Sequence, residues 1–165
     1  MPAEIAATGF RALAPWEART DSVTHNAELE DQIRALADKF DSHRAVLSDL
    51  ARRIDALRTW GKEWEDYDAA PPAASAVELA DRWSKHLYLD VLDIGRPWVD
   101  PLITASENGE AMFEWQLRGR RLTIRVSEAG VEYSKLWGMP PNFYFEDGTA
   151  DTRQKRQTLW AWLVD

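Results

Sequence analysis

Apolar and polar residues alternate over residues 110–118 and again over residues 120–127. The apolar positions are Ala111, Phe113, Trp115 and Leu117 in the first segment and Leu122, Ile124 and Val126 in the second. Alternation with a period of two is typical of β-strands that have one buried face and one face in water. The two segments therefore predict a hairpin at the centre of a small antiparallel meander.

The turn between these segments sets the expected pairing. A two-residue turn at 119–120 would place Trp115 opposite Ile124 on the buried face. It would also place Glu114 opposite Arg125 on the solvent face, and opposite charges favour such a pairing. Because both faces agree in one register, we expect this alignment.

Two more turns extend the hairpin. A turn at 129–130 is predicted to lead into a strand in which Tyr133 faces Val126. A three-residue loop at 107–109, whose Asn-Gly pair tolerates positive φ, keeps Ile103 on the buried face. The predicted meander has four strands, over residues 101–105, 110–118, 121–127 and 131–136.

A second pattern, with spacings of four and three in alternation, runs from Asn26 to Trp60. Its positions are Leu29, Ile33, Leu36, Phe40, His43, Leu47, Leu50, Ile54 and Leu57. This spacing is typical of a heptad helix, and no glycine or proline interrupts it. At 1.5 Å per residue, about 35 residues predict a helix of about 52 Å.

That helix is longer than the body it would pack against, because residues 62–165 would form a domain about 33 Å across. Part of the seam must then meet another chain, unless the helix folds back at Asp41-Ser42. The heptad phase runs through that point, which favours one helix. We expect the C-terminal half of the seam to pack within the chain and the N-terminal half to meet a partner.

The residues predicted to contact this partner are Leu29, Ile33, Leu36, Lys39, Phe40, His43 and Arg44. In a parallel, in-register homodimer Lys39 would face Arg44, which is repulsive. The basic flanks fit a partner with acidic flanks, or the acidic remainder of this chain. His43 is interpreted as a tolerated or register-setting polar residue, with a pH switch as the alternative.

The remaining segments complete the expected fold. Ser75 and Glu78 form a capping-box pattern that opens a helix over 75–89. Asp151 could cap a terminal helix, and residues 143–145 could add a short edge strand.

The predicted fold is α+β, with a long N-terminal heptad helix and a four-stranded meander covered by one or two helices. The predicted divisions are a loosely ordered arm (1–23), the heptad helix (24–61) and a small α+β domain (62–165).

One stretch of the chain also resembles a known family. The residues are Trp64-x-x-Tyr67-x-Ala69-x-Pro71-Pro72, then Asn108-Gly109-Glu110, Glu114-Trp115, Leu122-x-Ile124 and Tyr133. Over residues 60–137 this order resembles a widespread family of small, uncharacterised bacterial proteins with a Trp-Asp-Gly-Tyr segment, Pro-Pro and a Leu-Glu-Trp strand in a β-meander. Glu65-Asp66 stands where that family has Asp-Gly. The resemblance implies the fold and no activity.

Composition narrows the function further. The net charge is −8, but 20 basic residues are interleaved with 28 acidic ones, so nucleic acid is not the expected partner. The absence of cysteine excludes disulfides, thiolate metal sites and cysteine nucleophiles and favours the cytoplasm. We expect no signal peptide and no membrane span.

Candidate chemistry is sparse. No nucleotide-binding or nucleophile-elbow motif is present, and we expect no cofactor, metal site or catalytic residue. The nine tryptophans favour a core of large side chains, with a binding surface as the alternative. The residues that could bind a small ligand are Trp64, Asp66, Tyr67, Arg118, Arg120 and Arg121.

These observations favour a non-catalytic protein-interaction module that engages a partner through the long helix, as an accessory, antitoxin-like or immunity-like subunit. Self-association through the helix is the other form of that interaction. A small-ligand or carbohydrate-binding domain that uses surface tryptophans is the first alternative. An enzyme that uses the acidic cluster Glu63–Asp68 is the second, although a solvated linker explains that cluster more simply.

Overall fold

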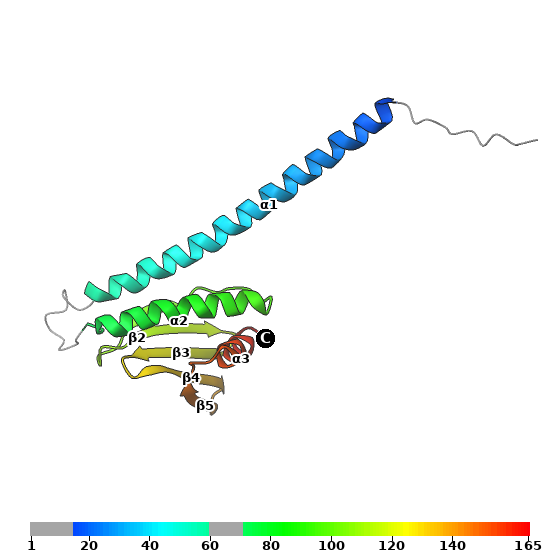
Figure 1. Ribbon diagram of the computed structural model, residues 1–165. Helices are drawn as coiled ribbons and strands as arrows, with labels where there is room; N and C mark the ends of the chain where they lie inside the picture. Colours follow the sequence, from blue (N-terminus) through cyan, green and yellow to red (C-terminus); the bar gives the residue numbers. More distant parts are fainter. Residues whose placement is uncertain (1–14, 60–70) are drawn as a thin grey trace, which may run out of the picture. The chain divides into compact units, whose positions relative to one another are not determined.

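The computed structural model describes residues 15–59 and 71–165, with side chains from residue 27 onward (Figure 1). The elements are α1 (Pro15–Asp55), η1 (Ala56–Thr59), α2 (Ala74–Asp93), β1 (Leu102–Ala105), β2 (Ala111–Leu117), β3 (Arg120–Ser127), β4 (Gly130–Met139), β5 (Asn142–Thr149) and α3 (Arg153–Val164). The chain divides into two compact units, residues 1–44 and residues 45–165. The α+β class predicted from the sequence is confirmed.

Helix α1 begins earlier than the sequence pattern predicted. It starts at Pro15 rather than Thr24, and proline suits the first helical position because its fixed φ is already helical. It ends at Asp55 and continues as the short 3₁₀ helix η1. Residues 15–23, predicted as a loose arm, therefore belong to the helix, while residues 1–14 and residues 60–61 at the end of the predicted helix lie outside the described residues.

The sheet has five antiparallel strands in chain order, so the prediction of four is wrong by one. The added strand is β5, which pairs with β4 from Glu132↔Thr149 to Met139↔Asn142. Its residues are exposed throughout. Without a buried face, β5 shows no apolar–polar alternation, which is why the pattern did not reveal its full length.

The register of the central hairpin differs from the prediction by two residues. Trp115 pairs with Leu122, and the two-residue turn lies at Arg118-Gly119 rather than at 119–120. Arg118 has φ 49° and Gly119 has φ 77°. Positive φ at both positions is the conformation that matches the twist of a two-residue hairpin, and glycine accepts it readily at the second. A shift of two keeps every side chain on its predicted face.

Of the predictions for the two neighbouring turns, one is wrong and one is confirmed. Val126 pairs with Val131, so the second turn lies at 128–129 and Tyr133 faces Ile124 instead of Val126. The three-residue loop between β1 and β2 is confirmed, because Ala105 pairs with Ala111. The Ser106 N–H donates to the Glu110 carbonyl at 2.9 Å and closes this loop.

Helices α2 and α3 cover the inner face of the sheet (Figure 1). Three fully or almost fully buried tryptophans, Trp83, Trp115 and Trp160, fill the space between the layers. Each indole N–H donates to a backbone carbonyl, at Ala150 (2.8 Å), Val99 (2.9 Å) and Pro97 (3.2 Å) respectively. The rings supply apolar bulk while their polar atoms stay bonded, which is how a small body can use very large core residues.

The helix starts also differ from the predicted caps. Helix α2 begins at Ala74 after Ala73, and the Ser75 hydroxyl donates to Glu128 Oε1 at 2.6 Å instead of capping the helix. Helix α3 is capped by Thr152, whose hydroxyl accepts from the Lys155 N–H at 3.2 Å. The predicted capping box is therefore wrong.

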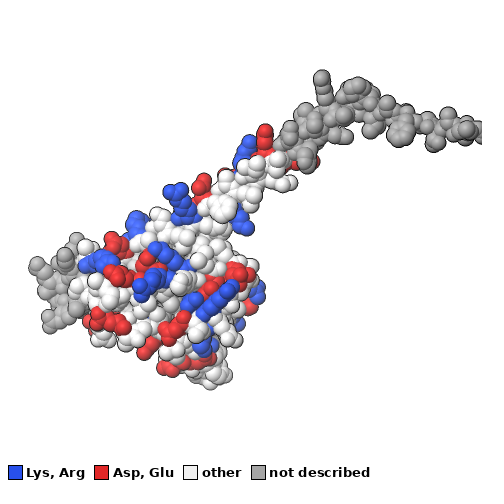
Figure 2. All heavy atoms as spheres, in the orientation of Figure 1, with Lys and Arg blue, Asp and Glu red and all other residues white. Residues whose placement is uncertain are grey.

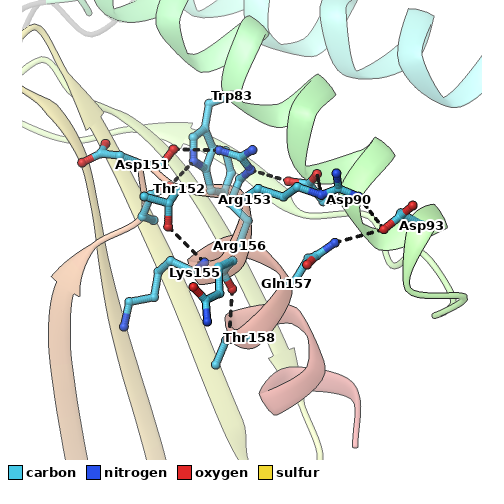
Figure 3. A network of polar contacts seen from close by, with 12 residues as sticks. Trp83, Asp90, Asp93, Asp151, Thr152, Arg153, Lys155, Arg156, Gln157 and Thr158 are labelled. Carbon is cyan, nitrogen blue, oxygen red and sulfur yellow. Dashed lines mark hydrogen bonds and ion pairs between the residues drawn. The ribbon is translucent and has the colours of Figure 1, made fainter.

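A buried ion-pair network joins α3 to α2 (Figure 3). Arg156 Nε lies 2.6 Å from Asp90 Oδ2, with both side chains about nine-tenths buried. Arg156 also donates to the Asp151 carbonyl at 2.9 Å, and Arg153 bridges Asp90 and Asp93. Each buried charge has a partner, so the network aligns the two helices over the sheet.

Candidate functional site

The first candidate surface is the N-terminal seam, which comprises Leu29, Ile33, Leu36 and Phe40 on α1. These four side chains are 49, 58, 56 and 71% exposed. The flanking Lys39 and Arg44 are exposed, and His43 is partly buried. Among the described residues, neither Lys39 nor Arg44 forms an ion pair. The sequence pattern thus leaves an apolar stripe in water with two basic side chains beside it.

The same heptad pattern continues into a buried region. The C-terminal seam, which comprises Leu50, Ile54 and Leu57, is 1% exposed at each residue and belongs to the core of residues 45–165. Nearby, the Arg53 guanidinium donates to the Pro101 carbonyl, which anchors this end of the helix beside the start of β1. The same heptad repeat is therefore exposed to solvent in its N-terminal half and buried in the core in its C-terminal half.

The three arginines predicted to bind a ligand do not form one site. Arg118 donates to the Val164 carbonyl at 3.2 Å, and Arg120 donates to the Trp162 carbonyl and lies over the Trp162 ring. Cations at a helix C-terminus interact favourably with its dipole, so these two side chains stabilise the end of α3. Arg121 points to the opposite face of the sheet, where it lies 3.6 Å from Glu114.

Described residues of the unit 45–165 line two hollows. The smaller, about 250 Å³, is lined by Arg121, Leu136 and Phe143 among others. The larger, about 460 Å³, lies between α2 and the end of α1. Its charged lining includes the ion pairs Asp55–Arg58 (2.8 Å) and Asp81–Lys85 (2.6 Å). In the described part of the chain, no buried side-chain polar atom lacks a hydrogen-bond partner.

The other predicted ligand residues, Trp64, Asp66 and Tyr67, lie outside the described residues, as does the whole acidic cluster Glu63–Asp68. Among the side chains that the structure describes, in residues 27–59 and 71–165, no group of three or more histidines and carboxylates is placed to hold a metal ion. The tryptophans with described side chains are buried or half-buried: Trp83, Trp98, Trp115, Trp137, Trp160 and Trp162. These six contribute to packing more than to an open surface.

A cluster of polar side chains links β5 to β4 and α3 by hydrogen bonds and an ion pair. Glu146 accepts from Lys135 Nζ and from the Tyr133 hydroxyl, both at 2.7 Å. Lys155 on α3 in turn donates to the Tyr133 hydroxyl at 3.1 Å. The bond from Lys135, and then that from Tyr133, hold the pKa of Glu146 below its ordinary value. The negative charge at this point on β5 is therefore compensated within the chain.

The second candidate surface, which sequence reasoning did not identify as a site, is the aromatic edge of β5: Phe143, Tyr144 and Phe145. These side chains are 58, 56 and 63% exposed. Strand β5 pairs only with β4 and ends the sheet on that side. Three consecutive aromatic residues have high β-propensity, and this was the signal in the sequence. The edge strand was predicted from the sequence, and the exposure of its three aromatic side chains comes from the structure.

The face shown in Figure 2 adds no third candidate. Acidic and basic side chains are interleaved on it without a large area of one sign. Among the helices that the structure describes, none combines the length and the apolar character needed to cross a bilayer.

Comparison of the chain with protein-family models, with curated proteins and with solved structures finds no match. The case for function therefore depends on the two exposed apolar surfaces themselves.

Proposed function

We propose that this protein is a non-catalytic protein-interaction module that engages a partner through the N-terminal seam. The observation that carries the proposal is the contrast along one helix: the C-terminal seam is buried, whereas the N-terminal seam is 49–71% exposed. Four large apolar side chains in one stripe on a helix are typical of a surface that a second helix covers.

The shape of this surface indicates the kind of partner. A heptad seam accepts another helix whose apolar residues pack between its own. Lys39 and Arg44 flank the seam and are exposed, so acidic flanks on the partner helix would complement them. A parallel second copy would place these two basic side chains opposite each other, which makes it the less favourable arrangement.

The biological role that fits best is an accessory, antitoxin-like or immunity-like subunit of a bacterial, cytoplasmic assembly. The support is by analogy: the chain is small and acidic, has no cysteine, and carries an exposed apolar seam on a long helix. The product of an adjacent gene is the first partner to test.

The test replaces the centre of the seam with charge. Ile33→Glu with Leu36→Glu should abolish co-purification with the neighbouring gene product while leaving the thermal melt of the dilute, monomeric protein nearly unchanged, because exposed apolar residues contribute little to folding. Leu89→Glu is the matched control, because Leu89 is a leucine of similar exposure (54%) on α2. It should retain the partner.

Two results would contradict the proposal. A partner that still binds the double variant does not use the N-terminal seam. A melt that falls strongly in dilute solution would mean that Ile33 and Leu36 belong to the core instead. Sedimentation at matched concentration must accompany the melt, because a dimer that dissociates also melts lower.

A further inference from the structure

Strand β5 has one edge that pairs with β4 and one that pairs with no strand of the described chain. The Ala150 N–H donates to the Val131 carbonyl at 2.9 Å, which fixes the alternation of bonded pairs along the β4–β5 ladder. Counting in twos from this pair, the backbone groups of Tyr144 point toward β4. Those of Phe143 and Phe145 point to the open edge, where they can bond another strand.

Natural edge strands usually carry features that prevent such pairing, such as lysine, proline or very short length. Strand β5 is eight residues long and contains neither lysine nor proline, and all its residues are exposed. Its charged residues, Glu146 and Asp147, follow the aromatic residues 143–145 and leave that segment without a charge. Strand β1, at the other end of the sheet, has four residues, and Arg53 occupies the Pro101 carbonyl just before it. Of the two edges of the described sheet, β5 is therefore the less protected.

We propose that β5 pairs antiparallel with β5 of a second copy of this chain, so that two five-stranded sheets join into one. The surface is separate from the N-terminal seam, so the inference goes beyond the proposed partner binding. The symmetric register that we assign places Tyr144 opposite Tyr144 of the second copy. Phe143 then faces Phe145 of the second copy, twice, on the face of the sheet that the helices leave open.

Charge favours this register over the one that is shifted toward the acidic residues. With Tyr144 on the two-fold axis, Glu146 faces Asn142 of the second copy, and no carboxylate faces a carboxylate or a ring. If Phe145 lay on the axis instead, Asp147 would face Phe143 and Glu146 would face Tyr144, which places charge against aromatic surface. Glu146 is already held by Lys135 at 2.7 Å, so its charge does not repel an approaching second copy strongly.

The same geometry predicts where assembly stops. Pairing through one identical edge on both copies is a closed two-fold contact. The remaining ends of the joined sheet are both β1, which differs from β5 in length and protection. The expected product is therefore a dimer and not a fibre.

The first experiment compares two matched lysine substitutions in the full-length chain by sedimentation velocity. Phe145→Lys changes the proposed interface, and Leu102→Lys changes a residue of similar exposure (60%) on the same face at the other edge of the sheet. The wild type and Leu102→Lys should be dimers. Phe145→Lys should be a monomer with an unchanged thermal melt in dilute solution.

The second experiment uses the fact that the chain has no cysteine. In the assigned register the two Tyr144 residues form a non-hydrogen-bonded pair, with Cα atoms about 4.5 Å apart, which a disulfide can span. Tyr144→Cys should give a covalent dimer under mild oxidation that disappears on reduction. Phe145→Cys should give much less, because each copy of that residue faces Phe143.

The outcomes separate the two proposals. A wild type that stays monomeric at its solubility limit, a Phe145→Lys dimer, or cross-linking through residue 145 in preference to 144 would overturn the proposed pairing. If Ile33→Glu with Leu36→Glu dissociates the dimer and Phe145→Lys does not, self-association belongs to the N-terminal seam. If Phe145→Lys instead abolishes binding to a different protein while the wild type is a monomer, a foreign strand occupies β5.

Discussion

The two halves of the heptad seam have the same residue types at the same spacing, yet they have opposite environments. Ile54 in the C-terminal seam is 1% exposed, whereas Ile33 in the N-terminal seam is 58% exposed. A heptad pattern in the sequence predicts that a helix face is buried. It does not indicate whether the same chain or another chain covers that face. Half of the seam therefore belongs to the core of residues 45–165, and the other half remains exposed.

The largest effect is expected when charged residues are placed in each half of the seam. Leu50→Glu with Ile54→Glu should abolish the cooperative unfolding transition of residues 45–165, because two carboxylates would be buried without partners. The measurement is circular dichroism against temperature, with Ile33→Glu and Leu36→Glu as the matched pair. Equal effects of the two double variants would mean that the seam is a single structural unit.

The next effect extends the comparison from apolar residues to ion pairs. Asp90→Ala should lower the free energy of unfolding by about 3–5 kcal/mol, because it leaves Arg156 charged and buried without its partner. Asp55→Ala removes an ion pair with Arg58 in which Asp55 is 74% exposed, and should cost at most about 1 kcal/mol. Urea titration of both variants tests the ratio. A small loss for Asp90→Ala would show that the buried network contributes little.

A single-residue version compares two isoleucines on one helix. Ile54→Ala should cost about 2–5 kcal/mol, because it opens a cavity in the core. Ile33→Ala should change stability by less than about 0.5 kcal/mol at a concentration where the protein is monomeric. Denaturant midpoints with equal slopes give the two values directly. The order would be reversed if residues 27–40 were the buried part of the helix.

The smallest effect concerns pH and the polar cluster on β5. Because its pKa is lowered in the folded protein, Glu146 stabilises the fold above its unfolded pKa, and this contribution disappears as pH falls through the folded value. Glu146→Gln should therefore melt slightly lower than the wild type at neutral pH and equally in acid. Glu107→Gln, in the exposed loop before β2, is the control. A constant difference across pH would indicate that the carboxylate charge is not the cause.

The sequence predicted the class of fold and the buried faces because both follow from local periodicity. The side chains of β2 and β3 lie on the faces expected, with Phe113 and Ile124 fully buried. The register of the strand pairs could not be predicted as reliably from the sequence. It depends on the turn conformation at Arg118-Gly119 rather than on the apolar pattern of the strands. A shift of two residues preserves the pattern while it changes every partner.

The candidate surfaces divide in the same way. The N-terminal seam followed from helical periodicity and from the mismatch between the predicted lengths of helix and body. The short edge strand predicted at residues 143–145 is confirmed as part of β5. Its full length and its role as a candidate surface did not follow from the sequence, because a strand exposed on both faces leaves no periodic signal. The candidate arginines are separated because consecutive strand residues point to opposite faces, which places Arg120 and Arg121 on different sides of the sheet.

The strand order of the sheet has a consequence for the time course of folding. Each strand pairs with the next one in the chain, so the sheet closes only short loops and should form quickly. The C-terminal seam, however, must await α2 and the strands, which leave the ribosome after it. For that interval the nascent chain presents the whole heptad seam to its surroundings. A partner that is made at the same time and place could therefore reach the helix before residues 71–165 have buried the C-terminal seam.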